Sequence, residues 1–258
     1  MGPPLTIDLN ADIGEGFGVW RMGDDDAMLR VVTSANVACG FHAGDPEIMA
    51  HCFASAGANG VSIGAHVSFP DLAGFGRRSL GLSASEIETA VAYQLGAAEA
   101  LARRAGHRVV YVKAHGALAN LAERDAPTAD AIARAVAAVD SSLVLLAIAC
   151  SEQVGAAERN GLAAAHEIFA DRAYAEDGHL APRSEAGAVI DDPGAVADRV
   201  REMLEAGAII TRGGVRLPTP IDSVCVHGDT PHAVETARAL RAALERAGWE
   251  LRPFAARA

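Results

Sequence analysis

Short apolar runs rich in β-branched residues alternate with longer, alanine-rich segments along the whole chain. The runs predict β-strands near residues 5–11, 34–39, 60–65, 108–114, 143–149, 164–169 and 221–227, with a short last strand near 249–253. Strands that alternate with helices are typical of βα units around a parallel sheet. Seven or eight such strands in 258 residues predict an α/β fold, a TIM-like (β/α) barrel forming one domain over residues 1–258. A doubly wound sheet is the alternative.

Capping signals mark several helix starts. Ser83 and Glu86 have the spacing of a capping box, and an apolar stripe at helical spacing follows them. Asp45 and Asp192 each precede a proline, an arrangement typical of a first helical turn. Capping is sufficient to explain Asp45, and for Asp229 it competes with a role in a binding site.

Composition narrows the class of protein. Half of the residues are hydrophobic, the formal net charge is −11, and no cluster of Lys and Arg resembles a phosphate-binding stripe, which argues against a nucleic-acid partner. The four cysteines form no CxxC pair. No secretory signal is recognisable, and no apolar stretch approaches the roughly 20 residues of a membrane span. We therefore expect a reduced, cytoplasmic protein without a membrane segment.

Four histidines, His42, His66, His115 and His227, each follow a predicted strand and lie beside small residues. A histidine is costly to bury and titrates near neutrality, so four in the same local setting indicate that several strands end at one place. In α/β folds that place is where ligands bind. The pattern predicts an enzyme active site.

The first strand carries three polar residues at alternate positions, Asp8, Asn10 and Asp12, which therefore share one face. Such residues are costly to bury unless they bind one another or a ligand. We expect at least one to be functional, and Asp8, nearest the bottom of the barrel, to belong to a structural polar network.

Asp12 can converge with His42 and His66, which follow the next two strands. The three side chains suit a divalent metal, although no HxxxH or HxxH spacing links them. The alternative is that each imidazole forms a hydrogen bond to substrate or to a carboxylate.

Lys113 and His115 share one face at the end of the fourth strand, where a lysine can hold an anion and a histidine can move a proton. A salt bridge from Lys113 to Asp8 or Asp12 is the structural alternative.

Three long loops, residues 12–23, 66–82 and 170–190, follow predicted strands and are expected to be functional. Arg77 and Arg78 in the second loop suit an anion clamp, with one of them structural. Asp171, in the third loop, is expected to form part of a wall of the site.

The free Cys39 is expected to be a small buried residue rather than a nucleophile. The chain has no GxxxxGK[ST] loop and no GxSxG motif.

Several blocks of sequence resemble the LamB/YcsF family: residues 7–18, 34–46, 74–78, 112–118, 169–174 and 227–229. The second block, with its ACGFHAGDP run, is the most specific. The resemblance implies the A subunit of a bacterial three-component 5-oxoprolinase, which opens the 5-oxoproline lactam to L-glutamate with ATP, together with partner subunits B and C. It also implies a barrel related to the glycoside hydrolase/deacetylase group.

We assign site roles on this basis. The expected catalytic residues are Asp12, Lys113 and His115, with Asp12 or His115 activating water. The expected substrate-binding residues are Asn10, Glu15, Asn36, Arg78, Asp171 and His227, and the expected metal ligands are Asp12, His42 and His66. ATP is expected as co-substrate, bound mainly by the partners because this chain has no ATP motif, and a divalent metal is the second expected cofactor.

The chain departs from the family pattern at a few positions. Val67-Ser68 replaces the usual proline-glycine after the third-strand histidine, and Ala114 and Ala119 replace a proline and a tyrosine. The charged groups are kept. If these replacements have a functional effect, we therefore expect it on substrate identity or on contact with the partner subunits, more than on the reaction class. Two other functions stay open: a metal-dependent deacetylase-like hydrolase that needs no ATP, and a non-catalytic component that binds the substrate.

Overall fold

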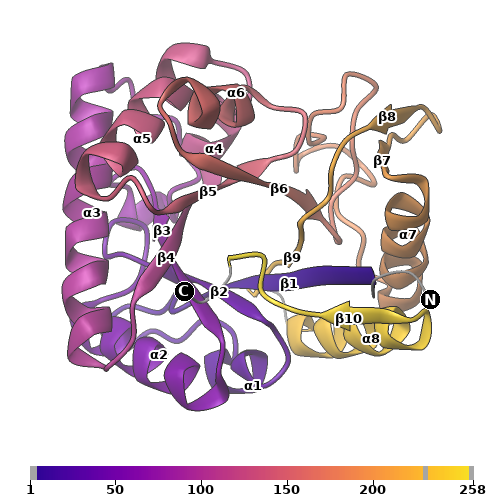
Figure 1. The fold of residues 1–258 in the computed structure, drawn as a ribbon, viewed down its shortest axis with the longest axis horizontal. Helices are drawn as coiled ribbons and strands as arrows, with labels where there is room; N and C mark the ends of the chain where they lie inside the picture. Colours follow the sequence, from indigo (N-terminus) through magenta and orange to yellow (C-terminus); the bar gives the residue numbers. More distant parts are fainter. Residues whose placement is uncertain (1–4, 229–231, 256–258) are drawn as a thin grey trace.

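Seven parallel strands close into a barrel in the computed structural model, which describes residues 5–228 and 232–255 (Figure 1). β9 pairs with both β6 and β1, which closes the ring. The TIM-like barrel is therefore confirmed, and the doubly wound sheet is excluded. The strands of the ring are β1 (Leu5–Ile13), β2 (Ser34–Ala38), β3 (Ser62–Val67), β4 (Val109–Ala114), β5 (Val144–Ile148), β6 (Ala163–Phe169) and β9 (Ser223–Val226).

Three further strands lie outside the ring. β10 (Trp249–Leu251) pairs with the first residues of β1 and is not an eighth strand of the barrel. Its position matches the predicted last strand. β7 (Ala208–Ile210) and β8 (Arg216–Pro218) form an antiparallel hairpin that the hydrophobic pattern did not predict. Each of its strands has three residues, too few for a period of two to be recognised.

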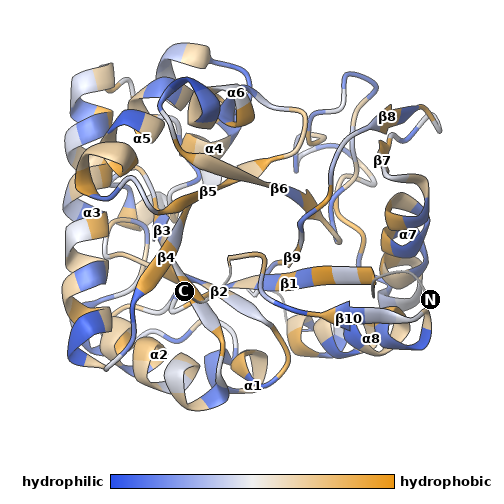
Figure 2. Ribbon diagram, in the orientation of Figure 1, coloured by the Kyte–Doolittle hydropathy of each residue, from blue (hydrophilic) through white to orange (hydrophobic). Residues whose placement is uncertain are grey.

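Helices surround the ring (Figure 1), and many of their outward positions are hydrophilic (Figure 2). The capping box of Ser83 and Glu86 is present, and Asp45 and Asp192 cap the helices that follow them, as predicted. Asp229 lies outside the described residues. Among those residues, no helix is both long and apolar enough to cross a membrane. The helices are α1 (Asp25–Leu29), α2 (Pro46–Asn59), α3 (Ala84–Arg104), α4 (Gly116–Ala122), α5 (Ala126–Val139), α6 (Glu152–Arg159), α7 (Pro193–Ala206) and α8 (Ala233–Arg246), with a 3-10 turn at Leu72–Gly74.

A polar network fills the lower part of the barrel around Asp8. The hydroxyl groups of Thr33 and Ser34 donate to its carboxylate at 2.7 and 2.6 Å, and Ser223 donates from β9. These contacts join β1 to β9 and to the start of β2, which is the structural role expected for Asp8. Burial outweighs the three hydroxyl donors and raises the pKa of Asp8 to about 6.

The raised pKa of Asp8 predicts a pH-dependent contribution to stability. The folded protein holds this proton more tightly than the unfolded chain, so the contribution is fully present below about pH 4 and is lost as the pH rises through about 6. Asp8→Asn removes this titration. We expect the free energy of unfolding of the wild type, relative to Asp8→Asn, to fall by on the order of 2 kcal/mol between pH 4 and pH 7. Urea denaturation across that range measures it, and a pH-independent difference would contradict it.

Gly64 leaves the space that Tyr111 occupies inside the barrel. A Cβ at Gly64 would overlap the tyrosine ring, whose hydroxyl donates to Asn36 at 2.7 Å. The same ring packs against Phe254, with 4.9 Å between ring centroids, near the end of the described chain. The tyrosine thus fills the bottom of the barrel because the neighbouring strand has no side chain there.

Gly64→Ala is expected to destabilise the protein by about 1–3 kcal/mol, because the added methyl group overpacks a filled interior. Gly96→Ala is the matched control, since Gly96 lies exposed in α3 with open space around its Cβ position. There alanine should be neutral or stabilise the helix by up to about 1 kcal/mol. Denaturant unfolding of both variants measures the difference, and equal stabilities would contradict this account.

Candidate active site

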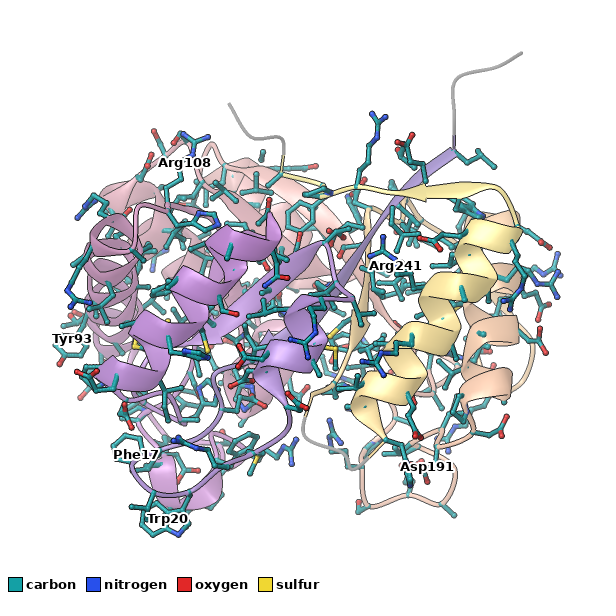
Figure 3. All side chains as sticks on the ribbon, turned by 90° about the horizontal axis from the view of Figure 1, so that it is seen from below. Phe17, Trp20, Tyr93, Arg108, Asp191 and Arg241 are labelled. Carbon is teal, nitrogen blue, oxygen red and sulfur yellow. The ribbon has the colours of Figure 1, made fainter. Side chains whose placement is uncertain are left out.

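A cavity of about 680 Å³ opens at the carboxyl ends of the barrel strands. The loops after β1 and β6 lie at this end, and Figure 3 shows Phe17, Trp20 and Asp191 from these loops at the same end of the molecule. This is the end at which barrel enzymes carry their active sites. Ionisable side chains lining the cavity include Asp12, His66, Arg77, Lys113, His115, Glu123, Arg124, Arg172, Arg183 and His227.

The ammonium group of Lys113 lies at the inner end of the cavity and is almost completely buried. It contacts Asp12 at 3.1 Å and Glu167 at 2.9 Å, and lies 3.1 Å from the thiol of Cys225. Burial by itself would lower the pKa of Lys113, but Asp12, Cys225 and Glu167 raise it well above its usual value. The lysine is therefore charged. Its salt bridge to Asp12, which the sequence suggested as a structural role for Lys113, is present.

Asp12 is the ionised partner of this lysine. Burial would raise the pKa of its carboxyl, but the charges of His66 and Lys113 lower it well below its usual value. Its Oδ1 also accepts from the side chain of Asn36 at 2.8 Å. Burial raises the pKa of Glu167, which shares the ammonium group with Asp12. One positive charge is thus held between two carboxylates of unequal acidity.

Asn10 connects these groups across the interior. Its amide nitrogen donates to Glu167 at 2.9 Å and to Ser223 at 2.7 Å, and its oxygen accepts from Asn36 at 2.7 Å. The two asparagines, predicted as substrate ligands, are completely buried and do not line the cavity. In this structure they position the charged groups.

A cluster of three histidines and one acidic residue lies beside the Lys113 group. His66 Nε2 faces His115 Nδ1 at 3.0 Å, and the ring of His42 stacks on that of His115 with 3.8 Å between centroids. Glu15 Oε1 lies 3.4 Å from His42 Nε2 and 3.6 Å from His115 Nδ1. Burial and neighbouring imidazoles hold the pKa values of His42 and His115 well below the usual value, so both rings are neutral at pH 7.

The loop from Phe69 to Leu82 covers this cluster. Phe75 adopts a left-handed conformation with φ of 54°, and its carbonyl oxygen accepts from His115 Nε2 at 2.9 Å. Gly76 follows with φ of 64° and packs so closely that a Cβ would meet His115 and His42. The carbonyl oxygen of Gly76 accepts from the backbone of Ala117 at 2.8 Å, which ties the loop to α4. Only glycine fits this place.

Asp171 and His227 form a second ionisable pair on the cavity wall. His227 Nδ1 lies 2.8 Å from both carboxylate oxygens of Asp171, and its ring stacks on Phe169. Burial would raise the pKa of Asp171, but the charge and hydrogen bond of His227 lower it. Because the carboxylate accepts the proton of Nδ1, Nε2 is the ring nitrogen that remains to exchange a proton. This arrangement suits a general base.

Arginines surround the cavity, but Arg78 is not among its lining residues. The Arg78 guanidinium pairs with Asp71 within its own loop, which raises the pKa of Arg78, while the adjacent Arg77 lines the cavity. Arg172 and Arg183 line the cavity as well. The sequence favoured Arg78, whereas Arg77 is the one that lines the cavity, since two adjacent arginines in one loop give no signal of which one points inward.

Most of the predicted site residues do gather at one place. Asp12, Lys113, His66, His115 and His227 line the cavity, and Asp171 contacts it through His227. His42 and Glu15 lie directly behind the lining histidines. Cys39 is buried, and burial raises its pKa to about 12, as expected of a packing residue. The predicted convergence of strand ends is therefore present in the structure, whereas the pairing of Asp171 with His227 was not predicted.

Comparisons with known proteins show the family to which the chain belongs. The LamB/YcsF family profile matches residues 7–258. The A subunit of 5-oxoprolinase from Azorhizobium caulinodans is 57% identical over 250 residues, covering 97% of this chain and 99% of that protein. The protein of the same name from Gluconobacter oxydans is 56% identical and covers 96% and 97%.

Solved structures show the same fold. The lactam utilization protein from Thermus thermophilus superposes with a TM-score of 0.91 at 43% identity, covering 96% of this chain and 99% of that one. A putative cellobiose-phosphate cleavage protein from Enterococcus faecalis shares the fold alone, with a TM-score of 0.57 at 14% identity. The fold and cavity define a TIM-like barrel protein with a buried ionic site at its strand ends. The chain belongs to the LamB/YcsF family.

Proposed function

We propose that this chain opens the lactam ring of 5-oxoproline to L-glutamate as the A component of an ATP-dependent 5-oxoprolinase. The main support for the proposal is that one cavity is lined both by His227, a histidine oriented by Asp171, and by cationic groups. Relatives more than half identical over nearly the whole chain are named as the A subunit of 5-oxoprolinase, and a solved relative is named a lactam utilization protein.

The cavity chemistry suits an anionic cyclic amide. Arg77, Arg172 and Arg183 on its wall can hold a carboxylate, since guanidinium groups bind carboxylate and phosphate in bidentate fashion. At about 680 Å³ the cavity is larger than a small lactam requires, so a phosphoryl group on the substrate also fits. Lys113 at the inner end adds a fixed positive charge where an oxyanion develops.

His227 is the base that this geometry favours for water activation. Asp12, a candidate from the sequence, is occupied by Lys113 and Asn36, and His115 Nε2 is held by the carbonyl oxygen of Phe75. In the proposed step, His227 Nε2 takes a proton from water as the water oxygen attacks the ring carbon. The carbon–nitrogen bond then breaks, and the imidazolium returns the proton to the leaving nitrogen. A phosphoryl group on the former amide oxygen stays on the new carboxyl as an acyl phosphate, and a second water molecule cleaves it to glutamate and inorganic phosphate.

ATP coupling is proposed because a lactam is a stable amide with a poor leaving group. Phosphorylation of the amide oxygen would activate the ring carbon. This chain has no GxxxxGK[ST] loop, so we place ATP binding mainly on partner subunits B and C. The relatives support a multi-component enzyme, because their name describes them as one subunit of it.

Glutamate formation from 5-oxoproline tests the whole proposal. We expect product only when this chain, both partner subunits and ATP are combined, because activation and ring opening are divided among the components. Omitting each component in turn provides the controls. Hydrolysis by this chain alone without ATP would indicate an independent amidohydrolase instead, and full activity of the partners without this chain would show that it has no catalytic part.

The His227 assignment has its own test. His227→Gln in the assembled enzyme is expected to lower kcat by about 100-fold or more with little change in KM, because it removes the general base and leaves the arginines in place. His51→Gln is the matched control, since His51 lies on the surface of α2 and pairs with Asp26 in a similar way.

Asp171 is expected to act through His227. Asp171→Asn should lower kcat in the wild-type background and have no further effect in the His227→Gln background, since its orienting role disappears with the ring. Steady-state kinetics of the double-mutant cycle measure this. Additive losses would contradict the pairing, and so would a kcat near the wild-type value in His227→Gln.

A further inference from the structure

Four potential metal ligands from four separate elements converge at the wall of the cavity. Glu15 and His42 belong to the loops after β1 and β2, His66 lies in β3, and His115 follows β4. Each offers one donor atom, and the four atoms lie within 4.8 Å of one another, all in buried side chains. For four ligands bound about 2.0–2.1 Å from a tetrahedral zinc ion, the donors are roughly 3.3 Å apart. Three of the six donor separations, 3.0, 3.4 and 3.6 Å, match that spacing, and the others lie within 4.8 Å.

The hydrogen bonds around the cluster aim two nitrogen lone pairs at the same point. His66 Nδ1 lies 3.2 Å from the carbonyl oxygen of Lys113, and His115 Nε2 lies 2.9 Å from that of Phe75. A carbonyl oxygen only accepts, so each of these ring nitrogens carries a proton. The other two ring nitrogens, His66 Nε2 and His115 Nδ1, face each other at 3.0 Å. Both nitrogens can therefore bind one ion that lies between them.

Among the residues that the structure describes, the buried ring of His42 lacks the hydrogen bonds that its two nitrogens need. Its side chain is completely buried, and neither ring nitrogen has a hydrogen-bond partner within the described part of the chain. Leaving buried polar atoms unsatisfied is costly, so the arrangement needs a ligand to explain it. The ring stacks on His115 and touches Phe75 edge-on. Because the stacked rings are parallel, one of them has to rotate for both to bind the same ion.

We propose that Glu15, His42, His66 and His115 bind one divalent transition-metal ion, of which zinc is the closest match. Imidazole nitrogens with one carboxylate are ligands that suit zinc and neighbouring metals rather than magnesium or calcium. The backbone carbonyls of Lys113 and Phe75 orient two of the rings from outside, as outer-shell partners do in metal sites. Asp12, expected as a ligand from the sequence, is replaced in this set by Glu15 and His115.

The site goes beyond the proposed lactam hydrolysis and does not depend on it. His66 and His115 line the cavity, so the ion lies against the space where a substrate binds. A metal at such a place supplies Lewis acidity to a carbonyl oxygen or a water molecule. Metal binding is measured on the isolated chain without any turnover, so its failure and the failure of the proposed activity are separate results.

Zinc titration of the purified full-length chain tests the proposal. After removal of metal with a chelator, the wild type should take up one equivalent of Zn²⁺ against a competing chromophoric chelator. His42→Ala and Glu15→Gln should each weaken this binding by at least about 10-fold. His232→Ala is the control and should bind as the wild type does, because His232 is exposed beside a single carboxylate, Glu235. Circular dichroism verifies that each variant is folded.

Cobalt substitution gives a second readout. Co²⁺ in a site with nitrogen and oxygen donors should show visible absorption bands of a four- or five-coordinate ion in the wild type, and these bands should be lost in Glu15→Gln. Glu15→Gln preserves the side-chain shape, so it decides the matter if His42→Ala does not fold. Absence of stoichiometric Zn²⁺ binding by the wild type, or equal affinity in wild type and Glu15→Gln, would overturn the proposal.

Discussion

The burial of one ammonium group at the centre of the barrel is the constraint on which the other parts of the site depend. Lys113 on β4 meets Asp12 from β1 and Glu167 from β6, so a single charge joins three strands of the ring. Removing one member of a buried ion pair leaves the other uncompensated, which typically costs about 3–5 kcal/mol. Asn10 extends the same network to Ser223 on β9. The barrel interior is therefore held in register by polar contacts as well as by its hydrophobic outer layer.

This polar interior also explains why the site lies at one end. The lower end is filled by the buried side chains of Tyr111 and Asp8, the latter with its hydroxyl donors. The upper end is bounded by long loops, which place arginines around the cavity, and His227 joins them directly after β9. Strands supply the fixed charges and loops supply the groups that face a ligand, the division expected of a barrel with its site at the carboxyl ends of its strands.

Much of this arrangement could be predicted from the sequence because strand periodicity is local. Alternate polar residues in the first strand were sufficient to place Asp8, Asn10 and Asp12 on one inner face. The pairing register was not available: His66 lies within β3, opposite Lys113, and the pairing is shifted between Ile63 and Gly64. Contacts across the cavity could not be predicted from the sequence either. The pair of Asp171 and His227 joins residues 56 positions apart, and no local pattern encodes that distance.

Lys113 and the histidine cluster are electrostatically linked through Asp12. This carboxylate touches Lys113 at 3.1 Å and lies 3.4 Å from His66 Nε2, and its pKa is lowered by His66, Lys113 and also His227. A positive charge gained in the histidine cluster, from a proton or a metal ion, is therefore balanced by the same carboxylate that balances the lysine. Glu167 contacts the same ammonium group at 2.9 Å, so Lys113 keeps a carboxylate partner when Asp12 balances a charge in the histidine cluster.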